Sequence, residues 1–89
     1  MINAYEAYML MPSTKWQMKK YNEILKNVEE KIIEAANHDK NKIEVWVPEK
    51  YKPDVLGVLN ENNYDYDVLN ALFDPTANER MILICIRWP

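Results

Sequence analysis

The chain has 89 residues, of which 48% are hydrophobic and 28% charged, and its formal charge is -3 at pH 7. A chain this short buries only about 60 to 65% of the surface that its unfolded form exposes, so we expect a single domain spanning residues 1–89 and no large enzyme. A weakly acidic charge without a block of Lys or Arg disfavours binding to a nucleic-acid backbone. The single cysteine, Cys85, cannot form an internal disulfide, which indicates a reducing compartment such as the cytoplasm.

Targeting and cofactor motifs are absent from the sequence. The first twelve residues lack the basic start and the cleavage site of a signal peptide, so we expect no targeting segment there. No window approaches the roughly 20 apolar residues of a membrane span, so we expect no membrane partner. The only glycine is Gly57, which excludes the Gly-rich phosphate loops of the Rossmann and P-loop classes.

The first element is predicted over residues 3–11, either as a short helix or as an edge strand. Asn3 and Glu6 have the spacing of a capping box, in which the side chain at the helix start accepts a hydrogen bond from a backbone N–H three residues later. Pro12 would end this helix, because proline has no N–H to donate.

A long helix is predicted over residues 14–38, capped by Ser13 or Thr14. Apolar residues recur along it at spacings of three and four, the pattern of a helix with one face in the core. They are Tyr21, Ile24, Leu25, Val28, Ile32, Ala35 and Ala36. We expect the helix to end in the polar run that follows, with Asn37 or Asn41 in the left-handed conformation that glycine usually takes.

Three strands and a short helix are predicted in the rest of the chain. Residues 43–47 alternate between apolar and polar side chains, and Pro48 ends this strand. A helix over 53–62 follows. Residues 64–69 alternate two tyrosines with two aspartates, which is typical of an edge strand with one wet face. Residues 80–88 are apolar on both faces and therefore belong in the middle of the sheet.

The order of these elements predicts an α+β fold with a small three-stranded mixed sheet. The strands at 43–47 and 64–69 are joined by a helical crossover and should run parallel. The strand at 80–88 then inserts between them, antiparallel to both. The long and short helices pack against this sheet.

The side chains that could carry chemistry are few and dispersed. His38 lies in a polar turn near a helix end, and Cys85 lies in the most apolar strand, so we interpret them as a surface residue and an inert buried thiol. Asp65 and Asp67 point to the same side of one strand and could in principle hold Mg²⁺, but no third carboxylate joins them. We therefore expect no catalytic residue, no metal and no cofactor.

Aromatic residues exceed what one small core requires, since three Trp and six Tyr occur in the chain. We expect some to be exposed and to bind a ligand or partner together with two arginines. These candidates are Trp46, Tyr64, Tyr66, Arg80, Arg87 and Trp88. A second group, rich in Met and Tyr, is too apolar for an exposed terminal segment. We expect it to pack on another chain, as the seam of a homo-oligomer, or on the domain itself. Its members are Tyr5, Tyr8, Met9, Met11 and Trp16.

Several segments in this order also match a known type of protein. They are Asn3-Ala4-Tyr5-Glu6-Ala7, the run from Leu25 to Ala36, Ile43-Glu44-Val45, Asn63-Tyr64 and the apolar strand from Ile82 to Trp88. Together they resemble a widespread type of small tailed-phage accessory protein. The chain departs from that type by the extra residues 12–17 and by Asn62-Asn63, where a Gly-Tyr step is usual. The resemblance implies a host-takeover or anti-defence factor acting in the host cytoplasm, and it supplies no catalytic residue.

These observations lead to one main hypothesis and two alternatives. The main hypothesis is a non-enzymatic accessory protein that forms a homo-oligomer and inhibits a host protein by stoichiometric binding. In the first alternative, the protein sequesters a small signalling nucleotide. In the second, it is a minor virion or assembly component.

Overall fold

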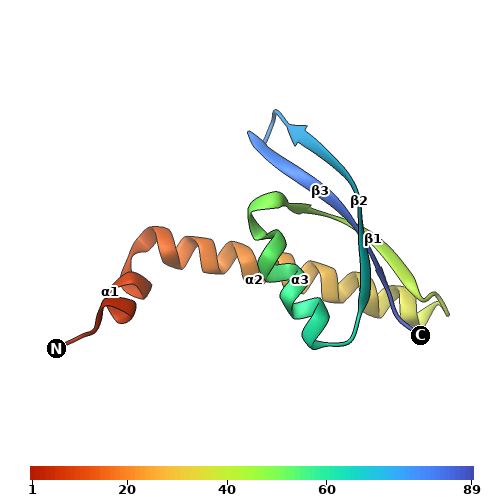
Figure 1. Ribbon diagram of the computed structural model, residues 1–89, viewed down its shortest axis with the longest axis horizontal. Coiled ribbons are helices and arrows are strands. Elements are labelled where there is room, and N and C mark those ends of the chain that lie inside the picture. Colours follow the sequence, from red (N-terminus) through yellow and green to blue (C-terminus); the bar gives the residue numbers. More distant parts are fainter.

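A computed structural model describes all residues, 1–89, and confirms the α+β fold (Figure 1). In chain order the elements are α1 (Ala4–Leu10), α2 (Pro12–Asn37), β1 (Lys42–Pro48), the 3-10 helix η1 (Glu49–Tyr51), α3 (Lys52–Glu61), β2 (Asp65–Asp74) and β3 (Glu79–Arg87).

The three strands form one sheet in the order β1-β3-β2. The last strand lies in the middle, as its apolar character predicted, and it pairs antiparallel with both neighbours. The outer strands run parallel to each other, as expected, but each hydrogen bonds only to β3. Both ladders are therefore antiparallel, and the prediction of a mixed sheet was wrong. Trp46 lies opposite Leu83 and Arg87 opposite Asp65 in this register.

One face of the sheet packs against the helices. The alternating residues Ile82, Ile84 and Ile86 of β3 are almost completely buried, together with Val45 and Val47 of β1. Helices α2 and α3 contribute the opposing layer of the core, through Val28, Val55 and Leu59 among others. The other face, which carries Trp46, Leu83 and Cys85, has no helix packed on it (Figure 1).

The helix ends differ in detail from the prediction. Helix α2 begins at Pro12 with no side-chain cap, because proline at the first helical position already has the required φ and lacks an N–H that would need a cap. Thr14, predicted as a cap, is instead a buried residue inside the helix. At the other end Asp39, not Asn37 or Asn41, adopts the positive φ of 58°.

The apolar stripe predicted on α2 is confirmed except at its last residue. Tyr21, Ile24, Leu25 and Ile32 pack against the core around the buried Val28. Ala35 is also buried, whereas Ala36 is exposed, because one residue step turns the chain by about 100° and takes its side chain off the stripe.

Strand β2 is longer than predicted, and its second half is the main element that the sequence analysis missed. It continues to Asp74 instead of ending near residue 69. A bulge between Val68 and Asn70 shifts the register with β3. An extra residue in one strand breaks the alternation of side chains between the two faces. The period-two pattern in the sequence is therefore interrupted there, and the strand was predicted to end too early.

Two parts of the molecule extend beyond the packed region, as Figure 1 shows. We call α1 with the first part of α2, residues 4–20, the arm. We call the end of the β2–β3 hairpin, residues 68–80, the hairpin tip. The molecule is accordingly elongated, with extents of 51 × 31 × 18 Å. None of its helices combines the length and apolar character that crossing a bilayer would require.

Candidate functional site

The arm carries the residues predicted to form an oligomer seam. Helix α1 starts as expected at Asn3, whose side-chain oxygen accepts a hydrogen bond of 2.8 Å from the backbone N–H of Glu6. This helix has no buried residue. Of the five predicted seam residues only Met9 is half-buried, and the other four are exposed. These four are Tyr5, Tyr8, Met11 and Trp16, with Leu10 and Met18 exposed beside them.

Trp16 is the largest apolar side chain on the arm, and 60% of its surface is exposed. The Nζ atom of Lys50 lies 6.0 Å from the centre of its ring and 5.3 Å from that of Tyr51. A cation over an indole face contributes little at an exposed site, about 0.5 to 1 kcal/mol. Trp16 is therefore oriented at the base of the arm while most of its surface stays open to a partner.

The hairpin tip is a second exposed apolar surface, and it was not predicted. Its members are Val68, Leu69, Leu72 and Phe73, all of them exposed. The outer edge of β2 carries no further strand, and between Val68 and Phe73 it has neither a charge nor a proline, the usual protections of an edge strand. The segment Val68–Phe73 has one polar residue, Asn70, among five apolar ones, and this composition was a usable signal for the surface.

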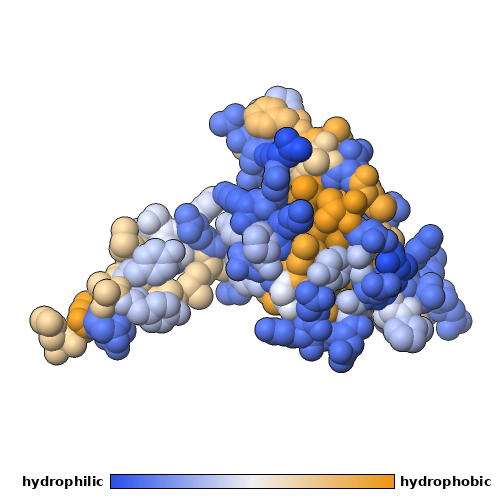
Figure 2. All heavy atoms as spheres, viewed as in Figure 1, coloured by the Kyte–Doolittle hydropathy of each residue, from blue (hydrophilic) through white to orange (hydrophobic).

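Figure 2 shows hydrophobic atoms gathered over the sheet beside α3 and up to the hairpin. The total accessible surface is 6627 Å², whereas a compact monomer of this mass exposes about 5,500 Å². The excess is therefore roughly 1,100 Å² by that scaling. The radius of gyration, 15.3 Å, likewise exceeds the roughly 12 Å of a compact domain of this length.

Arg87 and the two aspartates of β2 form the most polar cluster on the sheet. The guanidinium of Arg87 lies 3.2 Å from a carboxylate oxygen of Asp65 and 2.9 Å from one of Asp67. One of its nitrogens lies 3.6 Å from the sulfur of the buried Cys85. These hydrogen bonds, the one to Asp65 foremost, raise the pKa of Arg87 above its ordinary value. Because two carboxylates already compensate this charge, the cluster cross-links two strands and leaves little attraction for a phosphate.

The structure disperses the six residues predicted to bind a ligand. Arg80 and Arg87 are seven residues apart on one strand, or about 23 Å, and an odd separation places them on opposite faces. Arg80 pairs with Glu49 at 2.7 Å. Only Tyr64 and Trp88 meet, as an edge-to-face pair with ring centres 6.2 Å apart.

The remaining two candidates differ in exposure. The Tyr66 hydroxyl accepts a 3.0 Å hydrogen bond from Asn60, and its ring packs against the core. Trp46 stands alone on the uncovered face of the sheet, opposite Leu83, with 41% of its surface exposed. Of the six, Trp46 is therefore the one best placed to contact a protein partner.

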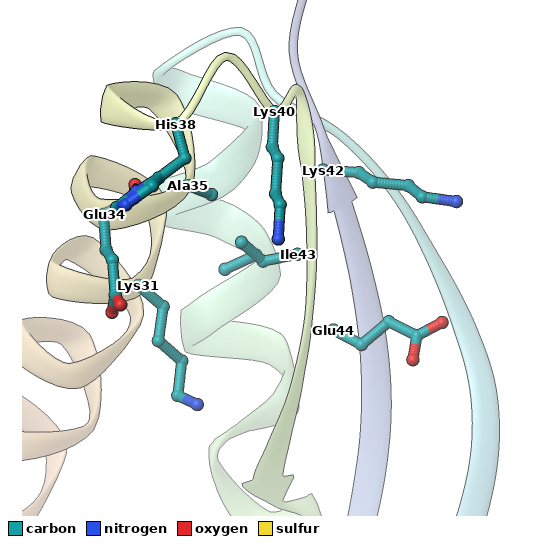
Figure 3. Close-up of a pocket in the computed structure, with 8 residues that line it drawn as sticks. All are labelled: Lys31, Glu34, Ala35, His38, Lys40, Lys42, Ile43 and Glu44. Atoms are coloured by element: carbon teal, nitrogen blue, oxygen red, sulfur yellow. The ribbon is translucent and has the colours of Figure 1, made fainter.

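The cavity around His38 is lined by basic and acidic groups, with no Ser, Thr or Cys among them. It measures about 330 Å³ and lies between the end of α2 and the start of β1 (Figure 3). Its lining residues are Lys31, Glu34, Ala35, His38, Lys40, Lys42, Ile43 and Glu44. The Nδ1 of His38 lies 2.8 Å from the carbonyl oxygen of Glu34, and because a carbonyl only accepts, Nδ1 must be the donor. His38 thus closes the end of α2, as its predicted surface position implied.

Comparison with protein-family models, with curated proteins and with solved structures finds no match to this chain. No group of three or more His, Cys, Asp or Glu side chains comes together in a way that could hold a metal ion. The exposed apolar side chains gather in three places, which are the arm, the hairpin tip and the uncovered sheet face around Trp46.

Proposed function

We propose that this protein is a non-enzymatic binding protein that works as a homo-oligomer. Two observations carry the proposal: the excess of about 1,100 Å² of surface over a compact monomer, and the exposed Tyr, Met, Trp, Leu and Phe side chains of the arm and the hairpin tip. Burial of apolar surface stabilises an association by about 25 cal/mol per Å² before the cost of immobilising the partners. An excess of this size matches what chains contribute to specific interfaces, about 800 Å² each.

The placement of the reactive side chains supports binding rather than catalysis. General acid–base or nucleophilic catalysis needs a nucleophile within hydrogen-bond reach of a base. The cavity that contains His38 has no Ser, Thr or Cys in its lining. Cys85 lies on the sheet opposite Glu44 and Asp67, and the paired aspartates are engaged by Arg87.

The proposed partner is a host protein, bound in a fixed ratio at the uncovered sheet face around Trp46. Large aromatic side chains commonly anchor protein interfaces, and the strands beneath Trp46 belong to the rigid core. The tailed-phage context and the virion role stay predictions. The nucleotide alternative also stays a prediction, although the distance between Arg80 and Arg87 no longer favours one shared phosphate site.

The assembly state is the first test of this proposal. Light scattering during size-exclusion chromatography, combined with native mass spectrometry, should give a multiple of the 10.6 kDa chain mass from low to high micromolar concentration. A monomer throughout this range would overturn the homo-oligomer. Extra mass of nucleotide size on the protein would favour the sequestering alternative.

The partner site is tested separately. Wild type and Trp46→Ala, immobilised at equal density, are exposed to a host-cell lysate, and the ratio of captured protein to bait is measured. We expect one protein at a fixed ratio with wild type and a loss of at least tenfold with Trp46→Ala, because hot-spot aromatics contribute about 2 kcal/mol or more. Equal capture by both proteins would remove Trp46 from the site.

A further inference from the structure

The arm and the hairpin tip are two apolar surfaces of opposite electrostatic character. The arm, residues 4–20, carries one acidic side chain, Glu6, against Lys15, Lys19 and Lys20, so its net charge is +2. The hairpin tip, residues 68–80, carries Asp74 and Glu79 against Arg80, so its net charge is -1. All three charged residues of β2 itself are aspartates.

Asp74 is the acidic side chain of the hairpin tip that forms no ion pair. Glu79 pairs with Lys50 and Arg80 with Glu49, while Asp65 and Asp67, outside the tip, pair with Arg87. Lys15 and Lys19 of the arm are exposed, and neither forms an ion pair within the chain. The arm therefore has free positive charge to offer to a partner surface.

Charge decides between the possible pairings of these surfaces. A contact between two arms would join two surfaces of net positive charge, and a contact between two hairpin tips would join two of net negative charge. Like charges across an interface oppose association and opposite charges favour it. An arm placed on a hairpin combines opposite charges with apolar surface on both sides.

Coverage of the apolar surfaces leads to the same pairing, because exposed apolar side chains lie on both the arm and the hairpin tip. A twofold contact through the arms would leave every hairpin tip exposed. A head-to-tail contact, repeated from subunit to subunit, covers both surfaces of every chain, and it closes into a ring or continues as a filament depending on the rotation between neighbours.

We infer that the arm of one subunit docks on the hairpin tip of a second copy of this chain. The apolar side chains of the arm, Trp16 and Tyr8 above all, pack over the free outer edge of the neighbour's β2, where Leu72 and Phe73 project to opposite faces of the sheet. Lys15 and Lys19 lie near its Asp74. The interface is heterologous, so each subunit uses a different surface toward each neighbour. This inference rests on the proposed homo-oligomer and specifies how its subunits meet.

Mixing two variants tests the contact directly. The arm variant is Tyr8→Ser with Trp16→Ser, and the tip variant is Leu72→Ser with Phe73→Ser. All four residues are exposed, so both variants should fold, which far-UV circular dichroism and thermal unfolding verify. The control is Ile33→Ser, because Ile33 is exposed on α2 outside both surfaces and its loss should leave the assembly unchanged.

The expected result is specific to a head-to-tail contact. Each variant alone should be monomeric, because neither can form the contact with itself. An equimolar mixture should form a dimer and nothing larger, because the intact arm of the tip variant meets the intact tip of the arm variant. A tip variant that still assembles with itself, an arm variant that does so, or a mixture that stays monomeric would overturn the inference. In each of these cases an oligomeric wild type would leave the proposed function standing, whereas a monomeric wild type would remove both.

Neutralising the lysines is a gentler second test. In Lys15→Gln with Lys19→Gln, the head-to-tail contact loses attraction, so the dissociation constant should rise by roughly three- to tenfold. If the arms instead paired with each other, the same change would remove repulsion and tighten the assembly. A tighter or unchanged assembly would therefore contradict the inference.

Discussion

The packed region and the two protruding ends of this molecule are made of the same kinds of residue but are stabilised very differently. Around Ile84 the isoleucines and valines of the sheet are almost completely buried between strands and helices. On the arm and the hairpin tip, residues as large as Trp16 and Phe73 stay mostly exposed. Apolar composition alone therefore does not mark the core. The core is marked by apolar residues that recur with the period of a helix or strand and face a second layer. Apolar segments without such a layer stay exposed.

The largest effect should come from the centre of the packed region. Ile84→Ala removes a side chain with no exposed surface and leaves a cavity, so we expect a loss of about 2 to 5 kcal/mol in the free energy of unfolding. The matched change on the hairpin tip, Leu72→Ala, should shift it by less than about 0.5 kcal/mol in the monomer. Urea unfolding at concentrations low enough to keep the chain monomeric measures both. Equal losses would abolish the distinction between the two regions.

The cap of α1 should affect only the arm. Asn3→Ala removes the hydrogen bond to the N–H of Glu6, which contributes about 1 kcal/mol to a helix. Because α1 buries no residue, its loss should leave global unfolding unchanged and should speed hydrogen exchange of the amides in residues 4–10 alone. Asn3→Asp, which keeps an accepting oxygen, is the control. Faster exchange in β3 would mean that the arm and the core unfold together.

Helix α3 belongs to the packed region and should respond globally. Gly57 lies inside this helix with a negative φ, and a Cβ added there would meet no atom within 4 Å. Gly57→Ala should therefore stabilise the whole domain by about 0.5 to 1 kcal/mol, because alanine loses less backbone entropy in a helix. The midpoint of urea unfolding should rise, and exchange across the sheet should slow with it. A drop in the midpoint would show that the site is tighter than the structure indicates.

The smallest effect is a dependence on alkaline pH at the boundary between the arm and the packed region. Burial first, and then Asp54 and Glu61, raise the pKa of Tyr21 above its ordinary value of 10.0. The folded state thus holds this proton more tightly than the unfolded state, so the associated stability is complete below pH 10 and declines as pH rises above it. Tyr21→Phe should flatten the decline in the thermal midpoint over that range. An unchanged slope would assign the pH dependence to other groups.

The sequence predicted the packed region well and the protruding ends poorly, and the cause is physical. A buried face leaves a periodic pattern, so the stripe on α2, the wet face of β2 and the central position of β3 could all be recognised. The bulge after Val68 interrupts the period, and the strand was therefore ended too early and the hairpin tip missed. The choice between helix and strand for residues 3–11 stayed open because α1 buries nothing that would impose a period.

The candidate site was predictable only in part. The composition of the arm indicated an apolar seam, and the structure leaves four of those five residues exposed. Spacing along the chain could not show that Arg87 forms ion pairs with Asp65 and Asp67, because these contacts depend on the register of β2 against β3. The same register separates Arg80 from Arg87.

Helix α2 also has a mechanical consequence. Over its 26 residues, or about 39 Å, it contains no glycine, and its only proline is the one at its start, so nothing in its interior provides a hinge. The first residues of α2, 12–20, belong to the arm, and the rest of the helix packs against the core. The helix is therefore a stiff connection between the two. A partner that binds the arm therefore also fixes the orientation of the sheet. In an assembly that forms through the arm, the angle between neighbouring subunits would be set by the backbone hydrogen bonds of α2.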